Sequence, residues 1–454
     1  MKKLLVPLML LPFLGMAQNE DSLFIKKISD EILRNGKAYE LLRQLTKQVG
    51  GRVAGSPQMV KAEQWGLKTM KEQGAGNAYL QECMVPHWVR GKGDKVFIAE
   101  IDNKKSDRFL DAAALGNSMG SNKAIVATIL TVENFEELER RKEEVKGKIV
   151  YYNAGFNPTN TKPFKSYGES GGYRRSGASR AAKYGAVGIM IRSLTESTDN
   201  NPHTGAMAYN DSFPKIPAVA LGNQDADYVW QLSKKSPFKI QMATHGKMLA
   251  DTIGHNVIGE LKGTDLPNEY ITIGGHLDSW DLAEGAHDDG AGAVQTIEVM
   301  RALKALGYQP KHSIRFVLFA NEENGTKGAE KYAQEAKAKN EKHIFALESD
   351  AGGFTPRGFG FTMSKELLDK IQPWAKLLKP YGIDDFSMGG GGADIGPLNK
   401  AFNTPLAGLQ PDGQRYFDLH HARNDVFENV NKRELLLGAV NMAGLIYLVD
   451  KYGL

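Results

Sequence analysis

From about residue 256 to the C-terminus, short continuous apolar runs alternate with longer segments whose apolar residues recur at helical spacing. The short runs have the length of strands and are rich in β-branched and aromatic residues, which is typical of strands buried on both faces. These predicted strands cover 270–274, 313–320, 343–348 and 405–409. The predicted helices between and after them cover 292–306, 327–340, 365–379 and 432–451. The alternation predicts an α/β fold with a mostly parallel central sheet flanked by helices.

Two regions of different character precede this one. Helical patterns come first, at 21–33, 37–49 and 58–73, and β-forming residues follow at 96–101. From about 116 to 244, short buried-strand patterns, a helix rich in small residues and a polar loop follow one another. Their strand ends carry no clustered histidines or acidic residues. We interpret this block as an inserted domain that shapes access to a site or recognition of a ligand.

The N-terminus has the pattern of a secretory signal. Lys2 and Lys3 precede an apolar run at 4–14, and small residues then lead to Ala17 and a polar stretch. We therefore expect export, to a periplasmic or extracellular location, with a signal peptide at 1–17. No later stretch reaches about 18 uninterrupted apolar residues, so we expect no membrane anchor. Cys83 is the only cysteine, which excludes an internal disulfide.

The composition of the chain indicates which classes of binding partner to expect. The chain has 454 residues, 41% of them hydrophobic, and a formal net charge of +4. These values describe an ordinary globular protein long enough for two or three domains. No basic block or basic-aromatic stripe is present, so we expect no nucleic-acid partner.

Histidines and acidic residues follow the ends of the predicted strands. The candidates are His276, Asp278, Asp288, Glu322, Glu323, Asp350, His420 and His421. Functional groups of a parallel sheet collect beyond the carboxyl ends of its strands, so we expect these side chains to meet. Mixed imidazole and carboxylate ligands suit Zn²⁺. Five ligands that share one carboxylate can hold two ions about 3.5–4 Å apart, an arrangement used for hydrolysis.

The motifs that carry these residues also resemble a known family. HLDSWD at 276–281, HDDGAGA at 287–293, ESDAGGF at 348–354 and the doubled histidine are similar to motifs of the dinuclear zinc exopeptidases. That family includes secreted bacterial aminopeptidases and glutamate carboxypeptidases, and the motifs look most like its carboxypeptidase Q (plasma glutamate carboxypeptidase) branch. The resemblance implies a zinc-exopeptidase fold with an inserted protease-associated-type domain. The implied domains are a catalytic domain in two parts, at 18–115 and 246–454, and the inserted domain at 116–245. Whether the first part begins with a short pro-segment is left open.

The resemblance also implies a role for each motif residue and two Zn²⁺ per chain. His276, Asp288 and Asp350 would hold one ion, and Glu323, His421 and the shared Asp288 the other. Glu322 would be the general base. Asp278 would orient His276 by accepting its second N–H.

Other residues near these motifs have more open roles. Many relatives have tyrosine where this chain has His420, so either His420 or Tyr416 is the candidate donor to the reaction intermediate. Gly391, in a run of four glycines, is a candidate for the wall of the substrate cleft. We expect Asp289 to be structural, as a helix cap, and Asp425 to anchor the loop that carries His421.

The resulting hypothesis is a secreted zinc exopeptidase that cleaves dipeptides or short peptides, with carboxypeptidase Q-like specificity. Peptides are the expected partners, and a homodimer is left open. An aminopeptidase on the same scaffold is the alternative; it would grip a free amine with an acidic residue, whereas a carboxypeptidase would grip a carboxylate with a basic one. Arg415 and Arg423 are candidates for such a grip, although surface positions suit them as well. A glutaminyl cyclase or a non-catalytic ectodomain is disfavoured by the complete ligand set.

Overall fold

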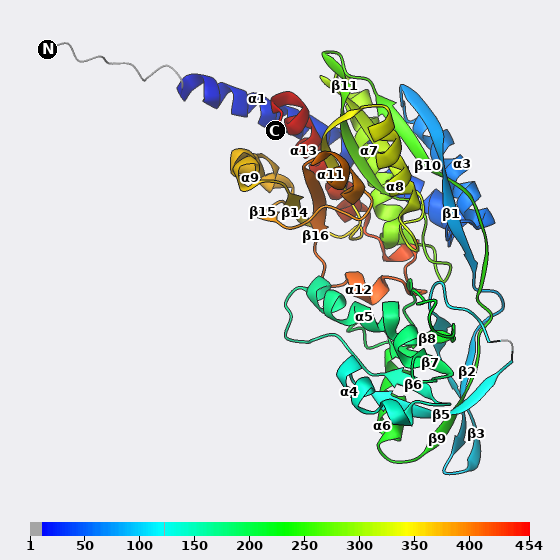
Figure 1. The fold of residues 1–454 in the computed structure, drawn as a ribbon. Helices are drawn as coiled ribbons and strands as arrows, with labels where there is room; N and C mark the ends of the chain where they lie inside the picture. The colour runs from blue at the N-terminus through cyan, green and yellow to red at the C-terminus, as the bar shows by residue number, and fades with distance from the viewer. Residues whose placement is uncertain (1–10, 122) are drawn as a thin grey trace.

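The computed structural model describes residues 11–121 and 123–454, which form two eight-stranded sheets (Figure 1). Most of the predicted signal peptide lies outside the described residues. Residues 11–17 belong to the first turns of helix α1 (Leu11–Asn35).

The first sheet has a parallel centre and antiparallel margins. Its strands, in spatial order, are β1 (Asn77–Val89), β10 (Lys247–Leu261), β12 (His312–Phe319), β11 (Leu266–His276), β13 (Lys342–Glu348), β16 (Leu406–Pro411), β14 (Pro356–Thr362) and β15 (Asp385–Met388). β12, β11, β13 and β16 are parallel neighbours, and each overlaps one of the four strands predicted from the apolar runs. β10 runs antiparallel to β1 and β12, and β14 runs antiparallel to β16. The predicted α/β fold is confirmed.

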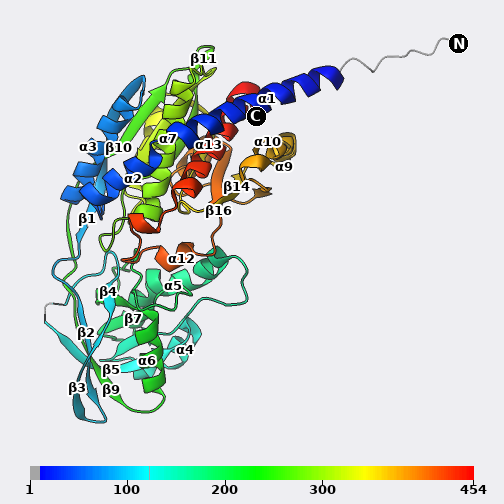
Figure 2. The ribbon, with the colours of Figure 1, turned by 180° about the vertical axis from the view of Figure 1, so that it is seen from behind.

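Helices cover both faces of this sheet. One face carries α1, α2 (Ala38–Gln44), α3 (Pro57–Glu72), α7 (Ala291–Ala305) and α13 (Lys432–Tyr452), which are seen in front of the sheet in Figure 2. The other face carries α8 (Lys327–Ala338) and α11 (Gly396–Phe402), packed on β10 and β13. By length and composition α13 could cross a membrane, but 83% of its most apolar window is buried, as in a core helix.

The helix predicted at 365–379 is interrupted in the structure. α9 (Lys365–Ile371) ends before Pro373, a tight turn follows, and α10 (Ala375–Leu378) continues the direction only briefly. Proline has no N–H for the helical ladder and its ring crowds the preceding turn. The apolar periodicity spans the proline, whereas the regular α-helical bonding gives way there to a 3₁₀ turn at Gln372–Trp374.

The second sheet lies beyond the carboxyl ends of the central strands (Figure 1). Its strands, in spatial order, are β3 (Lys104–Leu110), β2 (Lys95–Ile101), β9 (Phe238–Ala243), β5 (Ile125–Val132), β6 (Ile149–Tyr152), β7 (Gly188–Arg192), β8 (Ala218–Leu221) and β4 (Ala112–Ala114). It therefore begins about twenty residues before the boundary expected at 116. β2 pairs with β9 along its whole length, and a pairing between segments so far apart in the chain leaves no local pattern.

Three helices pack on the second sheet, namely α4 (Phe135–Arg140), α5 (Pro163–Ala182) and α6 (Asn223–Ser233). Figures 1 and 2 both place α5 beside α12 (Tyr416–Leu419), a short helix of the C-terminal region. Aromatic pairs join the two helices, with ring centroids of Tyr167 and Phe417 4.8 Å apart and those of Phe164 and Tyr416 5.4 Å apart. The second sheet is thus brought against the segment that precedes the doubled histidine.

Candidate functional site

The predicted ligands meet at the carboxyl ends of the central strands. His276 is the last residue of β11, the pair Glu322–Glu323 follows β12, and Asp350 follows β13. Asp288 lies in the turn at Ala286–Gly290 that leads into α7, and His421 follows α12. Four of these side chains line a cavity of about 450 Å³ together with Glu322, while His276 is fully buried behind it.

Asp288 is shared between two groups of side chains. Its Oδ1 atom lies 3.2 Å from Nε2 of His276, and the same nitrogen lies 3.4 Å from Oδ1 of Asp350. Its Oδ2 atom lies 3.2 Å from Nε2 of His421, and that nitrogen lies 3.1 Å from Oε2 of Glu323. The five predicted ligands are therefore brought together, with one Asp288 oxygen facing each group.

Several polar atoms at this centre have no hydrogen-bond partner. They include Nε2 of His276, Oδ2 of Asp288 and Oε1 of Glu323, all buried. Such atoms are costly to bury unless something else satisfies them. A divalent cation at each group would satisfy them, and imidazole with carboxylate is a donor set that suits zinc. The residues present therefore fit a metal centre.

The electrostatics of the centre point the same way. Burial works against a charged imidazole, but the Glu323 and Asp288 carboxylates raise the pKa of His421 to about 10. Burial and the charge of Asp288 raise the pKa of the Glu323 carboxyl to about 7. Both shifts mean that the crowded carboxylates favour bound positive charge, here a proton. A site of this kind also stabilises a bound cation.

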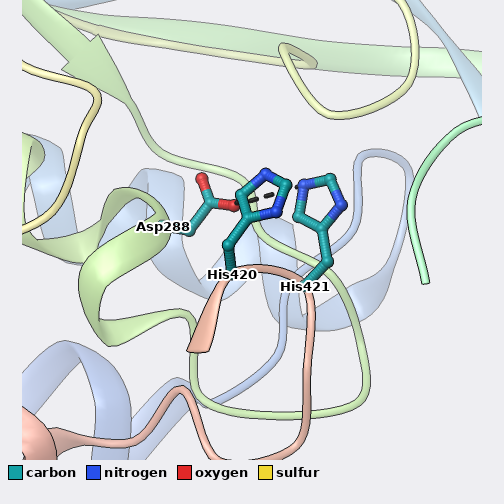
Figure 3. Close-up of side chains that lie close together, drawn as sticks. All are labelled: Asp288, His420 and His421. Atoms are coloured by element: carbon teal, nitrogen blue, oxygen red, sulfur yellow. Dashed lines mark ion pairs between the residues drawn. The ribbon is translucent and has the colours of Figure 1, made fainter. Parts of the chain in front are cut away.

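His420 lies directly beside this centre. Its ring stacks on that of His421 at a centroid distance of 3.5 Å, and both lie beside Asp288 (Figure 3). Its Nε2 atom is 3.6 Å from Oδ2 of Asp288. On the His421 side of the centre, Asp288, His420 and His421 therefore also form a set of donors that could hold a metal. Burial and the neighbouring His421 lower the pKa of His420, which favours a neutral ring.

The contact expected of the Asp278 carboxylate is made by its backbone instead. Nδ1 of His276 lies 2.9 Å from the carbonyl oxygen of Asp278 and 3.7 Å from its Oδ1. The carboxylate accepts hydrogen bonds from the N–H groups of Glu322, at 3.0 Å, and Glu323, at 3.3 Å. Asp278 thus holds both the histidine ring and the turn that carries the two glutamates.

Glu322 faces the same cavity and has an unusual environment. Burial raises the pKa of its carboxyl well above the ordinary value, and the carboxylates of Asp350 and Glu323 add to the effect although His276 opposes it. A carboxylate whose pKa is raised is a stronger base than an ordinary carboxylate, which favours proton transfer to it. Its position and environment suit the predicted role of general base.

The two aspartates expected to be structural bind backbone. Asp289 accepts from the N–H of His276 at 3.0 Å and from that of Gly292, in the first turn of α7, at 2.8 Å. Asp425 accepts from the N–H groups of His287, at 2.7 Å, and Asp288, at 3.1 Å. Asp425 therefore anchors the Asp288 turn and not only the loop of His421.

The remaining candidates border the site at different places. Tyr416 is buried and lines the cavity that contains the candidate ligands. Gly391, with φ +119°, lines a second cavity of about 560 Å³ that also reaches Asp350. Arg415 and Arg423 are exposed and line neither cavity, and Arg423 pairs with Asp111 at 2.8 Å.

Arg52 lies between the predicted helices at 37–49 and 58–73 and belongs to none of the motifs that indicated functional residues. It is fully buried and donates to four backbone carbonyls, that of its neighbour Gly50 at 3.3 Å and those of Leu277 at 2.5 Å, Glu284 at 2.6 Å and Gly285 at 3.1 Å. Leu277, Glu284 and Gly285 belong to the loop between His276 and Asp288. A lone arginine among small residues was the only sequence signal.

Replacing Arg52 by Met is expected to lower the free energy of unfolding by about 3 kcal/mol, because the carbonyls that it binds would lose a charged donor. Urea unfolding of the two proteins measures the difference. The control is Arg43→Met, which removes an exposed pair with Glu40 and is expected to cost no more than about 1 kcal/mol. Equal stability of the Arg52→Met and Arg43→Met variants would contradict the role of Arg52.

Comparison with known proteins identifies the family. Residues 256–445 match the model of peptidase family M28. Carboxypeptidase Q of Mus musculus is 34% identical over 415 residues, which cover 91% of this chain and 85% of that protein. The crystal structure of a peptidase M28 precursor from Shewanella amazonensis is 30% identical, with a TM-score of 0.89, and the match covers 95% of this chain and 97% of that one.

A more distant solved structure shares the fold. BSAP, a zinc aminopeptidase from Bacillus subtilis, is 19% identical, with a TM-score of 0.64, and the match covers 91% of this chain and 94% of that one. The site geometry, the family match and the similarity over nearly the full chain agree. The chain is a peptidase that belongs to peptidase family M28.

Proposed function

We propose that this M28 peptidase is a zinc exopeptidase with two Zn²⁺ per chain, which hydrolyses dipeptides or short peptides in the manner of carboxypeptidase Q. The observation that carries the proposal is the position of the Asp288 carboxylate between two groups of candidate ligands. One of its oxygens faces His276 and the other faces His421. A carboxylate placed in this way can bridge two ions. Similarity to carboxypeptidase Q over 91% of the chain supports the substrate class.

The residues of the site divide the work of hydrolysis between them. When bound, zinc makes a water molecule more acidic and polarises the scissile carbonyl. Glu322 takes the proton of the attacking water and delivers it to the nitrogen of the leaving amine. Asp278 holds Glu322 in place through the backbone N–H groups of the 322–323 turn. The buried setting keeps bulk water away from this proton transfer.

The N-terminal signal pattern supports export, which would place the activity outside the cytoplasm. The unit built on the second sheet would act as the inserted recognition domain, since α5 contributes to the wall of the cavity that contains Glu322 and Glu323. A homodimer is compatible with this arrangement.

An aminopeptidase is the second candidate function. It is favoured by two buried carboxyl groups beside the metal centre, Glu348 and Asp394. Glu348 lines the second cavity, and burial with the charge of Asp350 raises its pKa to about 8. Both carboxylate oxygens of Asp394 lack a hydrogen-bond partner. These groups could accept the free amine of a peptide.

A panel of dipeptides with free, N-blocked and C-amidated ends separates these functions. We expect zinc-dependent cleavage of peptides with a free carboxylate and little cleavage of the amidated ones, measured as kcat/KM by release of amino acid. A requirement for both free ends would identify a dipeptidase. Cleavage of amidated peptides as fast as free acids, with loss of activity on N-blocked ones, would instead establish an aminopeptidase.

A further inference from the structure

A short loop of the second-sheet unit lies against the backbone of the doubled histidine. The loop comprises His203, Thr204 and Gly205, between β7 and β8, and all three residues are buried. Nδ1 of His203 lies 2.7 Å from the carbonyl oxygen of His420. The N–H of Thr204 donates to the carbonyl oxygen of His421 at 3.0 Å. We call these three loop residues the histidine clamp.

The clamp also touches the side chain of His421. Nδ1 of this ring lies 3.3 Å from the carbonyl oxygen of Thr204 and 3.4 Å from a terminal nitrogen of Arg174. A carbonyl can only accept and a guanidinium can only donate, so Nδ1 can serve only one of them at a time. If Nε2 is to bind a metal, the proton of the neutral ring must be on Nδ1, and Thr204 is then its acceptor. The clamp therefore stabilises the tautomer in which His421 can be a ligand.

The second-sheet unit holds the clamp in place. The N–H of His203 donates to the hydroxyl oxygen of Ser193 at 2.9 Å. The hydroxyl of Thr204 donates to the carbonyl oxygen of Ala114 at 2.9 Å. Ser193 directly follows β7 and Ala114 ends β4, and both strands belong to the second sheet. The position of the clamp therefore depends on that sheet.

The two histidines of the centre differ in where the partners of their Nδ1 atoms come from. Nδ1 of His276 lies 2.9 Å from the carbonyl oxygen of Asp278, two residues further along the chain. The carbonyl that faces Nδ1 of His421 is 217 residues away in the chain and belongs to the other unit. His421 also has φ +63°, a backbone conformation that is unfavourable for a residue with a side chain and persists where its surroundings enforce it. The orientation of His276 is thus set locally, whereas that of His421 depends on the clamp.

We propose that the histidine clamp positions His421 for the metal that it shares with Glu323, so that the second-sheet unit completes one half of the metal centre. The proposal rests on the proposed dinuclear function. His203 is the positioning residue of the clamp, because its ring holds the carbonyl directly before His421. Loss of a group that orients a metal ligand lowers metal affinity about 10- to 100-fold. The clamp would therefore control the affinity of one ion and leave that of the ion at His276 unchanged.

The test replaces His203 by Phe and by Asn and measures zinc binding to the metal-free proteins by competition with a chromophoric chelator. Phenylalanine keeps a ring but leaves the His420 carbonyl without its donor, so one of the two ions is expected to bind about 10-fold more weakly. The other ion is expected to keep its affinity, because the Nδ1 partner of His276 is unchanged. Asparagine can place an N–H donor near the position of Nδ1 and is expected to restore most of the lost affinity.

A kinetic measurement separates positioning from general damage. In His203→Phe, hydrolysis of a dipeptide at limiting zinc is expected to fall with the occupancy of the weakened site and to recover when zinc is added in excess. Gly205→Ala tests the clamp without changing His203. The added Cβ would lie 2.5 Å from Nδ1 of His421, so this variant is expected to weaken the same ion. It decides the question if His203→Phe does not fold.

The control is His255→Phe, which removes a partly buried histidine of β10 that pairs with Glu63 at 2.9 Å. It is expected to lower the stability of the fold and to leave the affinities of both ions unchanged. Equal weakening of both ions by the clamp variants, or weakening of neither, would overturn the role of the clamp, while two ions in the wild type would still support the proposed function. A wild type that binds a single ion would overturn both.

Discussion

Replacing Glu322 by Gln is expected to lower kcat/KM for a dipeptide by about 10²- to 10⁴-fold while both zinc ions stay bound. Glutamine has nearly the shape of glutamate but cannot take a proton from water. Glu322 lies in the cavity of the ligands, and its backbone N–H is held by Asp278, so the substitution leaves the turn in place. Steady-state kinetics and elemental analysis of zinc measure the two effects separately.

Glu330→Gln is the matched control for this substitution. Glu330 is an exposed residue of α8 that pairs with Lys327 at 2.9 Å, so its loss is expected to leave kinetics and zinc content unchanged. Retained activity of Glu322→Gln would contradict its assignment as the base. If zinc were lost as well, Glu322 would be a ligand and Glu323 would become the candidate base.

Replacing Asp288 by Asn is expected to remove the high-affinity binding of both zinc ions and to lower activity about 10³-fold or more. Asp288 faces His276 with one oxygen and His421 with the other, and an amide keeps only one oxygen and no charge. The wild type is expected to contain two zinc ions per chain. Metal content after dialysis and dipeptide hydrolysis at added zinc test the two expectations.

Asp281→Asn serves as the control, because Asp281 lies in the same stretch of sequence but pairs with Arg90 at 2.7 Å, away from the ligands. Its metal content is expected to match the wild type. One tightly bound ion per chain in the wild type, unchanged by added zinc, would refute the dinuclear centre. Loss of a single ion in Asp288→Asn would show that Asp288 does not bridge.

Much of the central fold could be predicted from the pattern of apolar residues. β11, β12, β13 and β16 are buried strands whose apolar runs are continuous, and α7, α8 and α13 have clear helical periodicity. The antiparallel pair of β1 and β10 was not predicted. β1 lies at the edge of its sheet and β10 begins with exposed residues, so neither has a continuous apolar run.

The candidate ligands could be found because of a rule that holds for parallel sheets. Strands that run in the same direction have their carboxyl ends at one edge, so residues after β11, β12 and β13 must lie near one another. His276, Glu323 and Asp350 follow this rule directly. The contacts of Asp278 and Asp425 could not be predicted from this rule, because both carboxylates accept hydrogen bonds from backbone N–H groups of other segments.

By itself, the sequence determined the α/β architecture of the C-terminal part and the set of candidate residues at the carboxyl ends of its parallel strands. Both are consequences of local patterning, since burial and strand direction act through the spacing of neighbouring residues. Only the tertiary structure decided which oxygen of Asp288 faces which histidine, that Arg52 holds the loop between His276 and Asp288, and that Arg174 reaches His421. The contacts of Arg52 and Arg174 join segments more than 200 residues apart, so their geometry depends on tertiary packing and not on any local spacing.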